Sequence, residues 1–320
     1  MKKVISLILS VLMLSSLLCG CGAAPADDGM IKVAIVQQLD HSSLDEIRAA
    51  MEQEFAAIDS LEIQVDVFNG QNDASVLNQI GTQVVAEGYD MILPIATTAA
   101  QCMVTAADGS GIPVVYAAVS DPETAGLTDL DNVTGVSDAL NTAFILDMML
   151  AVQPDIRTVG LLYSNSEPNS ETPIAQAKAY LDEKGIAYIE KTGTTSGEVI
   201  AAASALVGQV DAVFTPTDNA VMAAEVSVAE ILNEAGIPHY TGADSFVLAG
   251  AFATCGVNYT ELGSQTAAMA IAILQGGEIG EFQVMDGGII TVNTETAAAL
   301  NLDYSVFSQM ANTINEVTTG

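Results

Sequence analysis

The chain has 320 residues, and its 40 acidic residues against only 8 Lys and Arg give a formal net charge of −32 at pH 7. This charge argues against nucleic acid as a partner, because nucleic-acid binding depends on basic side chains that neutralise phosphates. The length exceeds what one hydrophobic core usually serves, so two domains are expected.

The N-terminus reads as a secretion signal. Lys2 and Lys3 precede an apolar run from Val4 to Leu18, which is shorter than the roughly 20 residues of a membrane span. The run ends in Leu18-Cys-Gly-Cys21, which resembles a bacterial lipobox with a small residue directly before the acylated cysteine. We expect a lipoprotein signal peptide over residues 1–20, lipidation of Cys21 and a tether over residues 21–30. The mature body is then extracytoplasmic and anchored to the cell membrane.

Strand-like and helix-like segments alternate along the rest of the chain. The first round has strands at 31–36, 61–68, 91–95 and 113–118 and helices at 44–58, 73–87 and 98–108. The second round has strands at 159–163, 187–191, 211–215 and 238–240 and helices at 141–152, 172–184, 198–207, 219–235 and 245–249. Strands that alternate with helices of this length predict parallel sheets covered by helices on both faces.

The last elements belong to neither round. They are a strand at 251–258, a helix at 260–275 and a strand at 288–292. We expect them to complete the two sheets, so that the chain crosses between lobes near Ser137, Val257 and Met285. The predicted fold class is α/β, with two Rossmann-like lobes of parallel strands joined by a hinge of several crossings.

The expected lobes are discontinuous in sequence. Lobe 1 comprises residues 31–137 plus about 257–285, and lobe 2 comprises residues 138–256 plus about 286–320. Two lobes with a hinge form a cleft.

Polar residues follow nearly every predicted strand. In an open parallel sheet, ligands bind beyond the carboxyl ends of the strands. The candidate ligand-binding residues at these ends are Gln38, Thr97, Thr98, Ser120, Asp121, Glu167, Asn169, Ser170, Asp218, Asn219 and Asp244. Capping of the next helix is the alternative role, notably for Thr97, Ser170, Asp218 and Asp244. We assign Ser170 to such a cap.

The scarcity of basic residues limits how an anionic group can bind. Arg48 and Arg157 are the two arginines, and neither is placed as an anion clamp. A ligand carboxylate would then meet helix N-termini and the hydroxyls of Thr97 and Thr98. The carboxylates that could hold a cationic amine are Asp121, Glu167, Asp218 and Asp244.

Other side chains near the strand ends have two open interpretations. His41 could contact a ligand or flank a helix at the surface. Four aromatic residues could line a pocket or belong to the core, namely Tyr116, Tyr163, Phe214 and Tyr240.

The sequence has no catalytic constellation. It holds two histidines, and it has no paired cysteines, P-loop, Gly-x-Ser-x-Gly or Gly-x-Gly-x-x-Gly motif. We therefore expect binding without chemistry, with no cofactor and no metal.

Several short motifs in chain order resemble one known family. They are His41-Ser-Ser-Leu-Asp45, Asn69-Gly-Gln-Asn-Asp73, Thr97-Thr-Ala-Ala-Gln101, Ala118-Val-Ser-Asp-Pro122, Asn132-Val-Thr-Gly-Val-Ser-Asp138, Tyr163-Ser-Asn-Ser-Glu-Pro-Asn-Ser170, Pro216-Thr-Asp-Asn219 and Asn258-Tyr-Thr-Glu-Leu-Gly263. The chain resembles the extracytoplasmic substrate-binding proteins of ABC transporters, of the type associated with tryptophan or tyrosine. One departure is Thr98, where that family commonly has Pro.

The resemblance implies the type I periplasmic-binding fold and a ligand enclosed between two lobes that close about the hinge. It also implies partners, namely an ABC permease with its ATPase, and a chain that acts as a monomer. We expect an amino acid ligand, with an aromatic one as the narrower choice. The alternatives are a nucleoside or sugar ligand, or a ligand-sensing ectodomain that signals to a membrane partner.

Overall fold

The computed structural model describes residues 29–285 and 287–319. The predicted signal peptide, Cys21 and most of the tether lie outside these residues. Residues Ile31–Gly320 form one compact unit that is built on two β-sheets. Within the described residues, no helix combines the length and the apolar character needed to cross a membrane.

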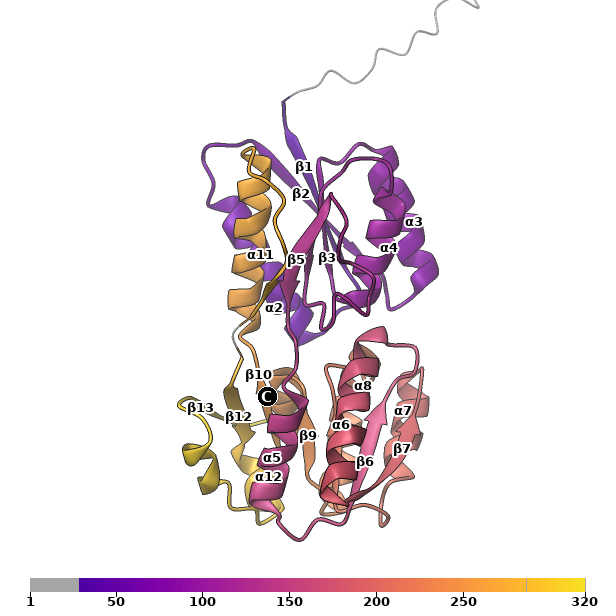
Figure 1. Cartoon of the computed structure of the whole chain (residues 1–320), viewed down its shortest axis with the longest axis vertical. Coiled ribbons are helices and arrows are strands. Elements are labelled where there is room, and N and C mark those ends of the chain that lie inside the picture. The colour runs from indigo at the N-terminus through magenta and orange to yellow at the C-terminus, as the bar shows by residue number, and fades with distance from the viewer. Residues whose placement is uncertain (1–28, 286, 320) are drawn as a thin grey trace, which may run out of the picture. The chain divides into compact units, whose positions relative to one another are not determined.

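The first sheet has six parallel strands in the order β11-β5-β4-β3-β1-β2. Their bounds are β1 (Ile31–Gln37), β2 (Ile63–Asn69), β3 (Met91–Ile95), β4 (Val114–Ala117), β5 (Val133–Ser137) and β11 (Gln283–Val284). The helices on this sheet are α2 (Ser42–Ala56), α3 (Ala74–Ala86), α4 (Thr97–Ala107) and α11 (Tyr259–Leu274). We call this sheet and its helices lobe 1 (Figure 1).

Alternate residues of β1 divide the core of lobe 1 between the two faces of the sheet. Val33 and Ile35 pack in the cluster that includes α2 and α11, whereas Ala34 and Val36 pack in the cluster that includes α3 and α4. All four side chains are fully buried. Residues buried on both faces of a sheet are apolar, which is why residues 33–36 of β1 show no alternation of polar and apolar residues.

The second sheet has seven strands in the order β13-β12-β10-β9-β8-β6-β7. Their bounds are β6 (Thr158–Tyr163), β7 (Ala187–Thr192), β8 (Ala212–Thr215), β9 (His239–Thr241), β10 (Ala253–Gly256), β12 (Ile289–Asn293) and β13 (Ile314–Val317). Each strand pair is parallel except β10 with β12, which is antiparallel. We call this sheet and its helices lobe 2.

The helices of lobe 2 cover both faces of its sheet. On one face lie α7 (Ser196–Ser204), α8 (Asn219–Met222), α9 (Glu225–Glu234) and α10 (Asp244–Leu248). On the other lie α5 (Thr142–Val152), α6 (Glu171–Lys184), α12 (Thr294–Ala299) and the 3₁₀ turn η2 (Ser305–Gln309). A second 3₁₀ turn, η1 (Pro168–Ser170), leads into α6.

The prediction of two α/β lobes with mainly parallel strands is confirmed, and several details differ from it. The helix expected at 219–235 is two helices, α8 and α9, which break between residues 222 and 225. Strand β5 was not predicted from the pattern. One of its residues is Gly135, where a Cβ would stand 2.2 Å from the carbonyl oxygen of Tyr116, so close packing keeps an apolar side chain out of this position.

The chain passes between the two sheets three times. It does so between β5 and α5, between β10 and α11, and between β11 and β12. These passages lie at the segments for which crossings were predicted, and Figure 1 shows the chain passing between the lobes there. Described residues of all three passages line one pocket, among them Ala139, Val257 and Gly287.

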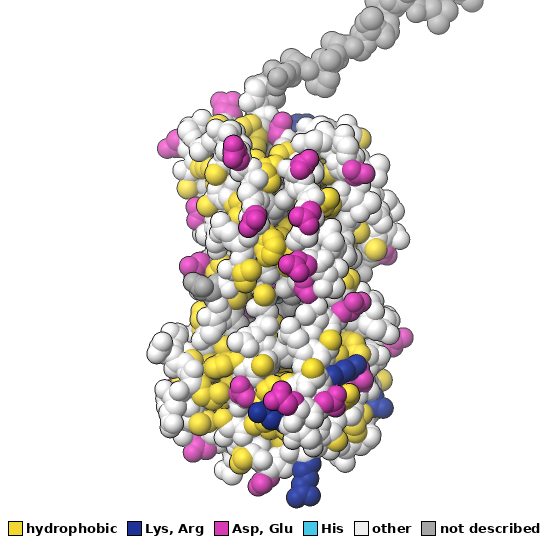
Figure 2. All heavy atoms as spheres, in the orientation of Figure 1, with side chains coloured by type: hydrophobic (Ala, Val, Ile, Leu, Met, Phe, Trp, Pro, Cys, Tyr) yellow, Lys and Arg dark blue, Asp and Glu magenta, His cyan; other side chains and the backbone are white. Residues whose placement is uncertain are grey.

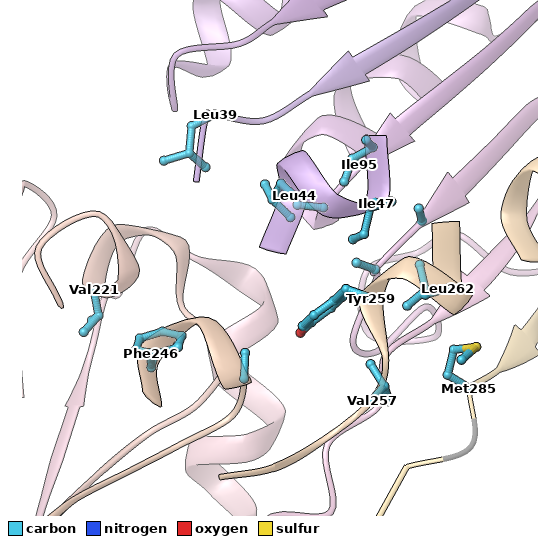
Figure 3. Packing of buried hydrophobic residues seen from close by; sticks show 14 of the residues in the cluster. Leu39, Leu44, Ile47, Ile95, Val221, Phe246, Val257, Tyr259, Leu262 and Met285 are labelled. Atoms are coloured by element: carbon cyan, nitrogen blue, oxygen red, sulfur yellow. The ribbon is translucent and has the colours of Figure 1, made fainter. Parts of the chain in front are cut away.

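One hydrophobic cluster continues from lobe 1 into lobe 2. It includes Leu39, Leu44 and Ile47 in lobe 1 together with Val221 and Phe246 in lobe 2. Figure 3 shows these side chains on both sides of the interlobe region, with Tyr259 at the start of α11 beside them. The two lobes therefore share a core, which is the packing of a closed two-lobed protein.

The exposed surface is predominantly acidic or uncharged. Figure 2 shows Asp and Glu scattered over both lobes on this face, with few Lys or Arg among them. A surface of this kind favours solubility and disfavours polyanionic partners.

The contact between α2 and α11 depends on a glycine. A Cβ at Gly263 would lie 2.5 Å from the carbonyl oxygen of Ile47 and 2.8 Å from the Cβ of Ala50. We expect Gly263→Ala to lower the free energy of unfolding by about 1 to 3 kcal/mol, because the helices must separate. Urea denaturation measures this change.

Gly197 in the first turn of α7 provides the matched control, because a Cβ there meets nothing within 4 Å. Gly197→Ala is expected to be neutral or stabilising by up to about 1 kcal/mol. Equal effects of the two substitutions would contradict the close packing of α2 and α11.

Candidate functional site

A cavity lies between the carboxyl ends of the two sheets, and both lobes line it. Lobe 1 contributes His41, Ser43, Leu44, Ala96, Thr97, Ala118, Ser120 and Tyr259. The first crossing contributes Asp138, and lobe 2 contributes Asn169, Thr217, Asp218, Asn219, Met222, Ala243, Ser245 and Phe246. The free volume is about 20 Å³, which is close to the space one water molecule needs. The walls must move apart to admit a larger molecule.

Two alanines in the cavity wall have unusual backbone conformations. Ala96 has φ 79° and ψ 161°, and Ala118 has φ 53°. Conformations of this kind cost about 1 to 3 kcal/mol each for residues other than glycine and concentrate at functional sites. The strain at Ala96 turns the chain directly from β3 into α4 at the cavity.

The N-terminus of α4 has no side-chain cap. Ala96 occupies the N-cap position and has no side-chain oxygen to accept from the first N–H groups of the helix. Thr97 follows it, lines the cavity, and has a buried hydroxyl without a partner. Free N–H groups and the positive end of the helix dipole favour an anionic group at this place.

Five buried polar atoms on cavity residues have no hydrogen-bond partner within the described part of the chain. They are His41 Nδ1, Ser43 Oγ, Thr97 Oγ1, Asn169 Oδ1 and Ser245 Oγ. An unpaired buried polar group costs about 1 to 3 kcal/mol, so most such groups in proteins are paired. Five of them around one cavity indicate that a polar molecule binds there.

Asp138 supplies a buried negative group to the cavity. It is 5% exposed, accepts hydrogen bonds from Ser120 Oγ (3.0 Å) and Tyr259 Oη (3.3 Å), and forms no ion pair with the described residues. Burial raises the pKa of its carboxyl. A cationic group in the cavity would balance the negative charge of the Asp138 carboxylate.

Asp218 differs from Asp138, because it accepts from three protein donors, two of which are backbone N–H groups. Its oxygens accept from Ser164 N (2.6 Å), Ser170 Oγ (2.7 Å) and Val221 N (2.9 Å). Asp218 therefore holds the loop after β6 against the start of α8.

A chain of hydrogen bonds next to the cavity joins the lobes. Gln38 Nε2 in lobe 1 donates to Glu167 Oε1 in lobe 2 at 3.0 Å. Asn219 Nδ2 donates to Glu167 Oε2 at 2.8 Å, and Asn219 Oδ1 lies 2.9 Å from Nε2 of His41 in lobe 1. We call Gln38, Glu167, Asn219 and His41 the interlobe cluster. Since Asn219 Oδ1 can only accept, the His41 proton lies on Nε2, and Nδ1 is left as an acceptor.

Burial controls protonation in the interlobe cluster. Burial, and next the nearby Asp218 carboxyl, raises the pKa of Glu167 to about 8. Burial lowers the pKa of His41, which favours its neutral form.

Two further contacts bridge the lobes at the rim. Thr172 Oγ1 donates to Asp121 Oδ2 at 2.6 Å, and Ser120 Oγ lies 3.1 Å from Thr217 Oγ1. Together with the interlobe cluster they hold the cavity shut.

The structure places the predicted site residues in three groups. Those that line the cavity are Thr97, Ser120, Asn169, Asp218 and Asn219. Those near it that join or support the lobes are Gln38, Glu167, Ser170 and Asp121. Thr98 and Asp244 lie outside the cavity lining, and Asp244 lines a separate pocket with Glu46.

The assignment of Ser170 to a helix cap is wrong, and the alternative capping role is not found for Thr97 or Asp244. Ser170 makes no cap bond to α6, because as the last residue of η1 it has helical φ −83° and ψ −19°. An N-cap needs an extended backbone. Thr97 and Asp244 are the first residues of their helices, after the N-caps Ala96 and Ala243. Asp218 is a true cap, of α8.

The aromatic residues of the cavity are not those considered from sequence. Tyr116, Phe214 and Tyr240 are fully buried in the cores of the lobes. Tyr163 packs against the lobe 2 core and donates to Glu190. The aromatic residues that line the cavity are Phe246, in the middle of α10, and Tyr259, the first residue of α11.

Other lining residues were also missed. Ser43, Asp138 and Tyr259 lie within the short motifs quoted from the sequence, and that was the signal that could have found them. Ser245 directly follows Asp244 at a strand end whose polar residues were candidates, and that was its signal. Phe246 carried no comparable signal.

Comparison with known proteins places the chain in a family. Residues 32–311 match the family model described as ABC transporter substrate binding protein. The Tyrosine-binding protein of Clostridioides difficile is 31% identical over 324 residues, which cover 94% of this chain and 93% of that protein.

Two solved structures are similar over most of their length. The ABC domain in complex with L-Trp from Streptococcus pneumonia matches with a TM-score of 0.83 and 28% identity, over 89% of this chain and 99% of that chain. A ligand-free, open substrate-binding protein with adhesive properties from Clostridium difficile matches with a TM-score of 0.68 and 32% identity, over 91% and 100%. The poorer fit to the open structure, despite its higher identity, agrees with the closed lobes described above.

The family model covers most of the chain, and the tyrosine-binding relative matches nearly end to end. The chain therefore belongs to the family of ABC transporter substrate binding proteins.

Proposed function

We propose that this chain is the extracytoplasmic, lipid-anchored solute-binding component of an ABC importer and that its ligand is an aromatic amino acid. The observation that carries the proposal is the interlobe cavity, in which five buried polar atoms have no hydrogen-bond partner and the Asp138 carboxyl has no cationic partner in the described chain. A zwitterion with an apolar side chain supplies what these groups need. The tyrosine-binding relative and the L-Trp complex support the choice of an aromatic side chain.

The two charges of an amino acid fit two different places in the cavity. Its carboxylate suits the uncapped N-terminus of α4 with the Thr97 hydroxyl, where backbone N–H groups replace the missing arginine. Its ammonium suits Asp138, which is buried and has only neutral donors around it. Burial strengthens both interactions, because the local dielectric is lower than that of water.

Closure couples binding to the shape of the protein. The interlobe cluster and the bond between Thr172 and Asp121 form only when the lobes approach. A ligand that contacts both lobes stabilises this arrangement by its higher affinity for it. A permease with its ATPase would then recognise the closed form and take up the ligand, with no catalytic step in this chain.

Anchoring is assigned to the N-terminal segment. Cleavage before Cys21 and its lipidation would leave residues 22–30 as a tether between the membrane and the two-lobed body. One tethered chain then acts as a monomer beside its permease.

Ligand binding is expected to raise the melting temperature, because the ligand binds only the folded state. A thermal-shift screen of the twenty amino acids, common nucleosides and sugars should give its largest shifts with L-Tyr and L-Trp. Shifts with sugars or nucleosides alone would contradict the amino acid assignment and leave the family unaffected.

Asp138→Asn removes the expected partner of the ammonium. We expect it to weaken amino acid binding by about 2 to 5 kcal/mol, as for other buried charge pairs, measured by calorimetry. Asp244→Asn is the matched control, because Asp244 is a largely buried carboxyl outside the cavity, and burial raises its pKa to about 6. Equal affinities of Asp138→Asn and the wild type would refute the ammonium site.

Stability should depend on pH through the interlobe cluster. The pKa of Glu167 is about 8 in this structure against an ordinary 4.5, so the closed form binds the proton more tightly. The contribution of Glu167 to the stability of the closed form is therefore greatest below about pH 4.5 and falls as pH rises from there to about 8, by at most about 1.4 kcal/mol per pH unit. The lowered pKa of His41 acts in the opposite direction and reduces stability as pH falls below its ordinary value of 6.5.

Melting temperature measured against pH reports this loss of stability. In Glu167→Gln it should fall less between about pH 4.5 and 8, because the amide stays neutral. Glu234→Gln, at an exposed site at the end of α9, is the control and should keep the wild-type profile. An unchanged slope in Glu167→Gln would show that Glu167 does not link closure to protonation.

Cys21→Ser removes the proposed lipidation site. The variant is expected in the soluble extracytoplasmic fraction, whereas the wild type sediments with membranes, as judged by fractionation and immunoblotting. Membrane retention of the variant would contradict the lipid anchor.

A further inference from the structure

The cavity has two ends, and each is formed where helices of opposite lobes meet. At one end α2 of lobe 1 contacts α10 of lobe 2. At the other end α4 of lobe 1 contacts η1 of lobe 2. The second end holds Thr97 and Asn169, the groups suited to the main-chain part of an amino acid. The first end is therefore left for its side chain.

The end between α2 and α10 combines apolar walls with two hydroxyls. Leu44 and Phe246 are 3% and 2% exposed, and Met222 also lines the cavity. Ser43 and Ser245 each occupy the second position of their helix, directly before Leu44 and Phe246. Both hydroxyls are buried and have no partner in the described chain. We call these two residues the serine pair.

We infer that the serine pair determines ligand specificity, by selecting an apolar ring that carries a hydrogen-bonding group over one that does not. This inference rests on the proposed function and assigns the side-chain end of its site. Phenol and indole are the rings of this class among the common amino acids. The benzyl group of phenylalanine fits the same walls but offers no partner to either hydroxyl.

The chemistry of serine explains why one site can accept both rings. A serine hydroxyl can donate or accept a hydrogen bond and rotates to suit its partner. It can accept from an indole N–H, and it can donate to or accept from a phenolic oxygen. A plain phenyl ring leaves the hydroxyls unpaired in a buried site, and a site of this kind rejects a ligand that lacks the polar group.

The serine pair has a cost in the unliganded protein. An unpaired buried hydroxyl destabilises the fold that contains it. Replacement of either serine by alanine should therefore leave the melting temperature of the unliganded protein unchanged or raise it. A loss of binding in these variants then reports recognition and not unfolding.

Calorimetry with L-Tyr, L-Trp and L-Phe tests the inference on the wild type and on Ser43→Ala, Ser245→Ala and the double variant. The wild type is expected to bind L-Tyr and L-Trp at least about 10-fold more tightly than L-Phe. In the double variant the preference should fall to about 3-fold or less, because L-Tyr and L-Trp lose affinity and L-Phe does not.

Thr97→Val serves as the control at the opposite end of the cavity. It removes a hydroxyl expected to contact the carboxylate that all three ligands share, so it should weaken them equally and leave their ratios unchanged. Equal affinity of the wild type for L-Phe and L-Tyr, or an unchanged ratio in the double variant, would overturn the inference and leave the proposed function intact. Binding of none of the three would overturn the proposed function itself.

Discussion

The closed form of this protein depends on a buried carboxyl that bonds to both lobes. Glu167 accepts from Gln38 of lobe 1 and from Asn219 of lobe 2, and Asn219 in turn contacts His41 of lobe 1. All of these partners are neutral amides or a neutral ring. The contact between the lobes therefore consists of directional hydrogen bonds and contains no ion pair. The weaker attraction suits an interface that must open again.

The scarcity of cations explains much of the site. The described ion pairs of Arg48 are with Asp45 and Glu52 of its own helix, so this side chain is not directed at the cavity. The anionic part of a ligand must then meet backbone N–H groups, and the strained conformation of Ala96 delivers the start of α4 to the cavity. The cationic part of the proposed ligand would meet the Asp138 carboxyl, which forms no ion pair with a lysine or arginine of the described chain. The low content of basic residues is thus consistent with the proposed zwitterionic ligand, whose anionic part would meet backbone N–H groups and whose cationic part would meet Asp138.

The alternation of apolar strands and helices was enough to predict the two lobes, because parallel sheets are built from local units with a regular period. It also located strand ends, and five residues from those ends line the cavity. Asp138 was not predicted to line the cavity, because β5 contains Gly135 and lacks an apolar pattern that would identify it as a strand. Ser43 and Ser245 were not among the predicted ligand-binding residues for a different reason. Each follows the first residue of a helix, and only the approach of α2 to α10 brings them to the same cavity.

The three crossings between the lobes also govern the order in which the chain can fold. Strand β11, near residue 283, completes the first sheet, and strands β12 and β13, from residue 289 onward, complete the second. Helix α11 of lobe 1 precedes all three strands in the chain. For a chain exported from its N-terminus, neither sheet can close until the last segments have emerged. Loss of the segment that contains β11, β12 and β13 would thus leave both sheets without edge strands, instead of leaving one lobe intact.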